Sequence, residues 1–71
     1  MTTYAIVETD INGDILEDDG SRFYLNHSCL SSMSFGSEDM AWTTNSRLEA
    51  EGMSARIADV NYRHHDIVEL Y

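Results

Sequence analysis

Apolar and polar side chains alternate in several short segments of the first half of the chain, which is typical of half-buried β-strands. The alternation predicts strands over Thr3–Thr9, Ile15–Leu16 and Arg22–His27. Asn12-Gly13 lies between the first two, and it is the strongest short-range hairpin signal because both residues tolerate positive φ. A second turn is expected at Asp18–Ser21, from its composition.

The middle of the chain predicts one helix, over residues 38–51. Ser37 is a candidate N-cap, the two acids after it suit the first turn, and Gly52 suits the position after the last turn. The stripe of residues at helical spacing is only half apolar, so the expectation depends mainly on the caps. Residues 28–36 are expected to form a small-residue connection with three inward-facing anchors, Leu30, Met33 and Phe35.

After the helix the alternation returns to a period of two residues. It predicts strands over residues 54–62 and 66–71, separated by a polar turn at Arg63–His65. The resulting order, β-β-β-α-β-β, predicts a single α+β domain of residues 1–71 in which one helix covers an antiparallel sheet. A last strand ending at Tyr71 would leave an open sheet edge where a homodimer could form.

Length and composition narrow the class of protein. A chain of 71 residues buries only about 60% of its extended surface, so its stability should be marginal. Seven aromatic residues and no proline argue against disorder, and a single cysteine excludes an internal disulfide. The first residues lack the features of a signal peptide, and no apolar run approaches the roughly 20 residues of a membrane span. A cytoplasmic location is therefore expected.

Charge is the most unusual part of the composition. Thirteen acids face four arginines and no lysine, for a net charge of −9. Residues 1–20 carry −6 and residues 21–71 carry −3. Like charges crowded in this way repel one another and cost folding free energy. Nucleic acid and anionic membranes are polyanions too, so the expected partner is the basic surface of a protein or nucleoprotein complex.

The acids within residues 8–19 predict a partner-binding ridge. Alternate residues of a strand lie about 6.6–6.8 Å apart and face the same way. Carboxylates spaced in this manner can imitate a phosphate backbone and occupy a basic groove. Tyr4 or Trp42 would then be aromatic anchors. The candidate partner-binding residues are Glu8, Asp10, Asp14, Glu17, Asp18 and Asp19.

The spacing of residues gives little support to a metal site or to catalysis. Residues 10–14 resemble the opening of an EF-hand loop, but Ile15 and Ser21 stand where that loop needs glycine and glutamate. Four possible zinc ligands have no standard zinc-site spacing, and the two adjacent histidines could share an ion only from a turn. They are His27, Cys29, His64 and His65. No phosphate loop or nucleophile signature occurs, so we predict no enzyme, metal or cofactor.

In size, acidity and lack of an expected pocket, the chain resembles the small phage-encoded inhibitors of host defence, including anti-CRISPR proteins. The resemblance is one of general character, so it implies an acidic DNA-mimic inhibitor acting in the host cytoplasm but no particular site residue. Two alternatives remain open. The acidity could be an adaptation of an accessory domain to high salt, which the missing lysine fits. The chain could also be a homodimeric structural protein joined through edge strands.

Overall fold

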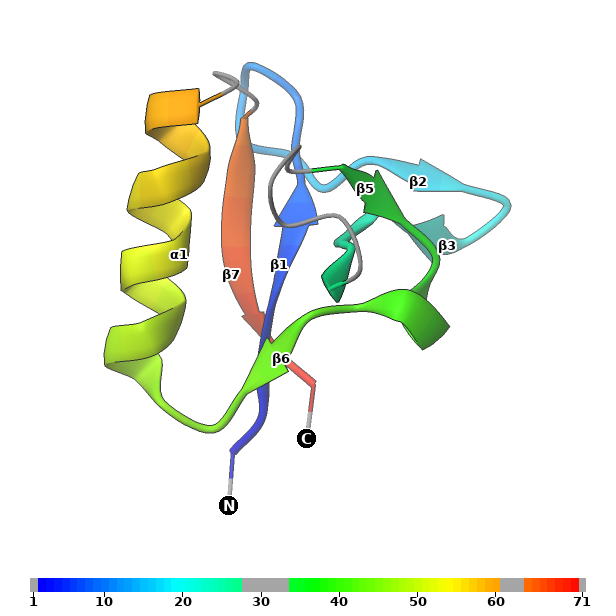
Figure 1. Cartoon of the computed structure of the whole chain (residues 1–71). Helices are drawn as coiled ribbons and strands as arrows, with labels where there is room; N and C mark the ends of the chain where they lie inside the picture. Colours follow the sequence, from blue (N-terminus) through cyan, green and yellow to red (C-terminus); the bar gives the residue numbers. More distant parts are fainter. Residues whose placement is uncertain (1, 28–33, 61–63, 71) are drawn as a thin grey trace.

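The computed structural model describes residues 2–27, 34–60 and 64–70 (Figure 1). Its central strand is β1 (Tyr4–Glu8), in which Ala5, Ile6 and Val7 are completely buried. The last strand, β7 (His65–Glu69), pairs antiparallel with β1 along its whole length. The strands predicted at the two ends of the chain are therefore confirmed.

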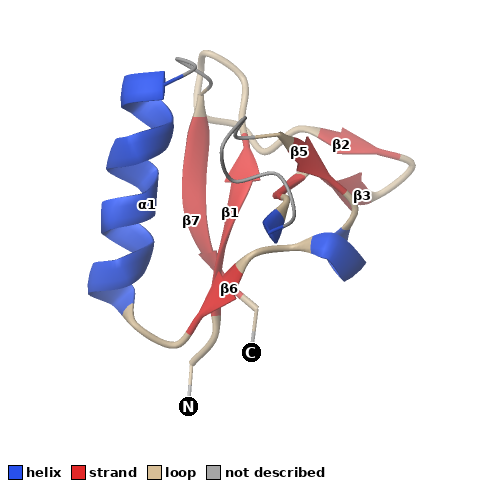
Figure 2. Cartoon of the chain, viewed as in Figure 1, coloured by secondary structure: helices blue, strands red, loops and turns tan. Residues whose placement is uncertain are grey.

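On its other edge β1 pairs with two shorter strands, also antiparallel. β6 (Thr43–Thr44) pairs with the first half of β1 and β4 (Tyr24–Leu25) with the second half. β5 (Phe35–Gly36) extends the sheet beyond β4. β2 (Glu17–Asp18) and β3 (Ser21–Arg22) form a separate two-stranded sheet (Figure 2). The strand predicted over Arg22–His27 is thus divided between the two sheets.

Helix α1 (Arg47–Val60) packs on one face of the main sheet. Ala50, Met53 and Ile57 are buried on it at spacings of three and four residues, which place them on one side of a helix. Met53 and Ile57 join Ile6 and Leu25 in the main core cluster. The opposite face of the sheet has a second apolar cluster, built on buried Ala5, Val7 and Tyr24.

The helix predicted over residues 38–51 is confirmed only for residues 47–51, and both of its ends are wrong. Only a short 3-10 helix, η2 (Glu38–Met40), follows Ser37, whose side chain makes no capping hydrogen bond. The α-helix begins after Ser46, whose Oγ accepts a hydrogen bond from the N–H of Glu49 at 3.2 Å. Ser-x-x-Glu is the signature of a helix N-terminus. Gly52, expected just after the helix, lies inside it.

The predicted strand over residues 54–62 is also wrong, because residues 54–60 belong to α1. Ala55, Arg56 and Ala58 in this segment are strong helix formers. Residues 61–63 and 71, like Leu30 and Met33, lie outside the described residues, whereas Phe35 packs against the core as expected. The α+β class is confirmed, but the elements do not follow the order β-β-β-α-β-β.

On the outer edge of β7, one backbone N–H group is hydrogen-bonded to a side chain of the same strand. Ile67 stands opposite Ile6 in the register of the two strands. The Thr9 N–H donates to the carbonyl of His64, and the Leu70 N–H donates to the carbonyl of Thr3. The backbone groups that bond to the β1 side are therefore those of the even-numbered residues. The Ile67 N–H therefore points outward, where the Asp66 carboxylate accepts its hydrogen bond at 2.8 Å. This bond reduces what the edge offers to a second copy of the chain.

Candidate partner-binding site

The β2–β3 hairpin projects from the body of the protein on the side opposite to α1 (Figure 1). Asp19 and Gly20 form its two-residue turn, with φ of 53° and 80°. Positive φ at both positions is type I′ geometry, which an Asp-Gly pair favours. The turn predicted here is therefore confirmed. The residues paired across the hairpin are Glu17 with Arg22 and Asp18 with Ser21.

The chain reverses direction at residues 10–14, as expected, but the turn is not the two-residue type that Asn12-Gly13 indicated. Gly13 has a φ of 89°, and its N–H donates to the carbonyl of Asp10. The Asp10 carboxylate accepts hydrogen bonds from the N–H groups of Asn12 at 2.9 Å and Asp14 at 3.0 Å. The predicted return strand at Ile15–Leu16 amounts to an isolated bridge. Asp10 therefore holds its own loop, and Asp14 remains exposed.

The six candidate acids lie at three places on the molecule. Glu8 is half-buried in β1, on the face that α1 covers, and stands opposite His65. Asp10 and Asp14 belong to the loop beyond the end of β1, which Figure 1 shows well away from the hairpin tip. The other three candidate acids, Glu17, Asp18 and Asp19, are exposed together on the hairpin.

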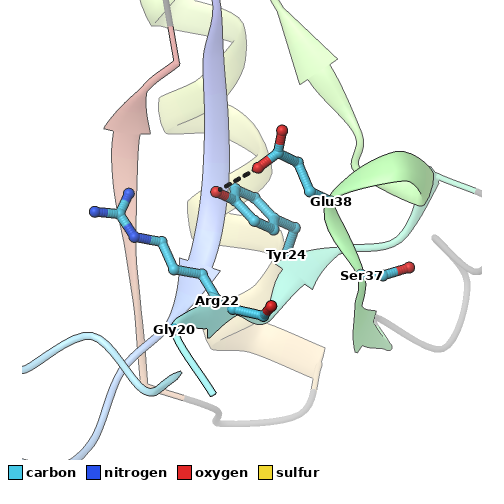
Figure 3. Close-up of a pocket in the computed structure, with 6 residues that line it drawn as sticks. Gly20, Arg22, Tyr24, Ser37 and Glu38 are labelled. Carbon is cyan, nitrogen blue, oxygen red and sulfur yellow. Dashed lines mark hydrogen bonds between the residues drawn. The ribbon is translucent and has the colours of Figure 1, made fainter. Parts of the chain in front are cut away.

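A second acidic segment lies beside the hairpin. η2 carries Glu38 and Asp39, and both side chains are exposed. The Tyr24 hydroxyl donates a hydrogen bond to Glu38 Oε1 at 3.3 Å (Figure 3). Burial raises the pKa of Tyr24 above its ordinary value of 10.0, and the Glu38 carboxylate raises it further, while Arg22 acts in the opposite direction.

The hairpin and η2 enclose a cavity of about 340 Å³. Its lining comes from both segments and from β4: Gly20, Ser21, Arg22, Tyr24, Ser37 and Glu38. We refer to the five exposed acids of the hairpin and η2 as the acidic lobe, namely Glu17, Asp18, Asp19, Glu38 and Asp39. With the single arginine among them, Arg22, the lobe carries a net charge of −4.

Residues Glu38 and Asp39 were missing from the candidates that the sequence indicated. The sequence pattern places both in the first turn of a predicted helix, where acids are common because they interact favourably with the helix dipole. The capping signal at Ser46 would have removed that explanation, because it moves the helix start nine residues along the chain. Their proximity to the hairpin depends on the pairing of β4 with β5, which the sequence pattern did not reveal.

The side of the molecule formed by α1 has mixed charge. Arg47 and Glu51 form an ion pair at 3.3 Å, and the Arg47 guanidinium lies 5.7 Å from the centre of the Tyr4 ring. Arg56 is also exposed on this helix. Tyr4 is therefore engaged beside α1, and Trp42 packs against the main core cluster. Neither of the expected aromatic anchors belongs to the acidic lobe.

Potential metal ligands do not gather in the part of the chain that the structure describes, where no group of three or more His, Cys, Asp or Glu side chains could hold an ion. His65 faces α1, with Nε2 lying 2.7 Å from Ser54 Oγ and 3.1 Å from Ser54 O. His27 and His64 are exposed. Cys29, the fourth possible zinc ligand, lies outside the described residues.

Comparison with known proteins found no match to a protein family, to a characterised protein or to a solved structure. Across residues 2–27, 34–60 and 64–70, no helix has the length and apolar character needed to cross a membrane. The acidic lobe and the cavity beside it are the part of the described structure that indicates a binding surface.

Proposed function

We propose that the protein is an acidic inhibitor that occupies a basic nucleic-acid-binding surface of another protein or nucleoprotein complex, as DNA-mimic anti-CRISPR proteins do. The observation that supports this function best is the acidic lobe, in which two segments distant in sequence place five exposed carboxylates at one projecting end of the fold. Charge that serves only solubility has no reason to be gathered there.

The hairpin carboxylates are available to a partner. Among the described residues, no hydrogen bond or ion pair engages the side chains of Glu17, Asp18 or Asp19. A carboxylate without an internal partner can exchange its water for an arginine or lysine of another protein without breaking a contact of its own. Closely spaced carboxylates also produce the strong negative field that attracts a basic groove from a distance.

The uneven charge would set the orientation of binding. The acidic lobe would face the basic surface, because it carries a net charge of −4, whereas α1 combines two arginines with three acids for a net charge of −1. An inhibitor held this way would block nucleic acid by occupying the same cationic side chains.

The proposal is tested by displacement of DNA. Purified CRISPR effector complexes and other basic nucleic-acid-binding complexes would be loaded with fluorescent DNA, and the protein would be titrated while anisotropy is followed. We expect displacement from at least one complex, with an apparent affinity that falls steeply between about 50 and 200 mM salt. The lobe variant Asp18→Lys with Asp39→Lys should lose more than about tenfold in affinity, since each change replaces attraction by repulsion.

A matched control carries the same change in charge elsewhere. Asp59→Lys with Glu69→Lys alters exposed acids of α1 and β7, and it should displace DNA nearly as well as the natural protein. Failure of the natural protein to displace DNA from any complex would refute the proposal. Equal losses in the two double variants, or displacement that is insensitive to salt, would show that the lobe is not the contact surface.

A further inference from the structure

The side chains of β4 and β5 point to two faces, and the pairing of the strands assigns each residue to one of them. Leu25 pairs with Phe35, and both lie in or against the core cluster under α1. Tyr24 points to the opposite face, where it joins the second cluster. Successive residues of an extended chain alternate, so Phe23 lies on the same face as Leu25.

A second cavity, of about 400 Å³, opens beside Phe23. Its lining is made by the hairpin, by β5 and by the residues that follow each of them: Asp18, Asp19, Ser21, Arg22, Phe23, Phe35, Gly36 and Ser37. Phe23 and Phe35 are both half-buried, and both contribute to the lining. Asp18 and Asp19 are exposed at the hairpin tip. The cavity therefore combines aromatic surface with two carboxylates.

Arg22 also lines this cavity, but the pairing of the hairpin directs its side chain to the face opposite to Asp18. Figure 3 shows its side chain on the Tyr24 side, around the first cavity. Its positive charge acts there to lower the pKa of Tyr24, against the larger effect of burial. In the hairpin Arg22 pairs with Glu17, whereas Asp18 pairs with Ser21. Cross-strand partners share a face, so Arg22 and Asp18 point to opposite faces of the hairpin.

The lining selects among chemical classes of ligand. An anion would be repelled by Asp18 and Asp19. A wholly apolar group would remove water from the two carboxylates without replacing their hydrogen bonds, which is costly. A cation with a flat, weakly hydrated head and an apolar stem suits this lining. It stacks on aromatic rings, and it donates hydrogen bonds to carboxylates.

We infer that this cavity binds one arginine side chain of the basic partner. The guanidinium would lie against the phenylalanine rings and donate hydrogen bonds to Asp18 and Asp19. Arginine is preferred to lysine because its planar group presents several donors in a fixed arrangement and stacks on aromatic rings. The identity of the biological ligand as a protein side chain rests on the proposed function, but the chemistry of the cavity can be tested without the partner.

The test uses the whole protein and blocked single amino acids. N-acetyl-arginine methylamide would be titrated against the isotope-labelled protein while amide shifts are followed by NMR. We expect saturable shifts at Gly20, Ser21, Gly36 and Ser37, with a Kd on the order of millimolar. The lysine analogue should bind about threefold more weakly or worse, and the uncharged citrulline analogue should give no saturable shift.

Two variants and a control locate the site. Asp18→Asn with Asp19→Asn should abolish saturable binding, and asparagine tolerates the positive φ of position 19, so the hairpin is retained. Phe23→Leu keeps an apolar side chain but should weaken binding about threefold through loss of the cation–π contact. Asp59→Asn with Glu69→Gln makes the same change in net charge on other elements and should bind arginine normally.

The outcomes separate this inference from the proposed function. Arginine binding at the cavity without DNA displacement from any complex would support the inference and contradict the inhibitory function. DNA displacement by a protein that gives no saturable shift with arginine would support the inhibitory function and contradict the inference. Equal shifts with arginine and citrulline, or equal binding by the Asp18→Asn, Asp19→Asn variant, would overturn the inference.

Discussion

Acidic side chains of the same type have different roles in this protein. Asp10 accepts two backbone hydrogen bonds and holds its own loop. Asp66 accepts the outward-pointing N–H of Ile67 on the edge of β7. Asp19 occupies a turn position with positive φ, which aspartate tolerates better than most residues. The charge count therefore overstates how many carboxylates are free to meet a partner.

Ionisation of Tyr24 should lower the stability of the folded protein at alkaline pH. Its pKa is higher in the folded protein than the ordinary 10.0, mainly through burial, so folding favours the neutral phenol. The contribution to stability is complete below about pH 10 and is lost as pH rises through the folded-state pKa. Tyr24→Phe should cost about 1 kcal/mol near pH 8, where the hydrogen bond to Glu38 is intact.

Urea unfolding of both proteins at about pH 8 and about pH 11 checks this prediction. The stability difference between natural protein and Tyr24→Phe should shrink or change sign at the higher pH, because the natural protein then has to bury a phenolate beside Glu38. A difference that stays constant over this range would show that Tyr24 does not titrate as the structure indicates.

At the scale of elements, helix α1 shows how two local patterns compete. Its residues are mostly strong helix formers, and Ser46 with Glu49 supplies a capping signal. The alternation after Gly52 suggested a strand because residues two apart happened to be similar in character. Buried Ala50, Met53 and Ile57 follow helical spacing instead. The sequence therefore contains the signals for this helix, but the apparent capping residues Ser37 and Gly52 indicate different ends.

Gly52→Ala should stabilise the protein by about 0.5–1 kcal/mol. Gly52 is an exposed position inside α1, and a Cβ added there meets no atom within 4 Å. Alanine in a helix interior loses less conformational entropy than glycine. Chemical unfolding measures the change, with Gly20→Ala as control, which should be destabilising because Gly20 has a φ of 80°. Destabilisation by Gly52→Ala would place Gly52 at a helix end instead.

At the scale of the whole molecule, the fold brings together acids that are far apart in the sequence and separates some that are close in it. The structure groups η2 with the hairpin and leaves Glu8 and the 10–14 loop elsewhere. It also puts Arg47 and Arg56 on the helix side. The asymmetry that the sequence showed between residues 1–20 and 21–71 thus becomes an asymmetry between two sides of the fold, centred on a partly different set of acids.

Moderate salt should stabilise the folded protein. The net charge of −9 creates repulsion that is largest when the acids are held close together. The Debye length falls from about 10 Å at 0.1 M to about 3 Å at 1 M, so most of the gain should be complete by about 0.5 M. Thermal melting against NaCl concentration measures it. A protein that remains unfolded below molar salt concentrations would instead be a salt-adapted domain.

The sequence by itself determined the terminal strands β1 and β7, the Asp19-Gly20 turn, the α+β class and the excess of acid. These features depend on alternation, turn chemistry and composition, which are local properties of the chain. Only the tertiary structure decided which acids share a surface and where a cavity forms. Both depend on contacts between segments separated in sequence, such as Tyr24 with Glu38, whose partners no local pattern specifies. The acidic lobe is therefore a product of strand pairing acting on a charge that the sequence already carried.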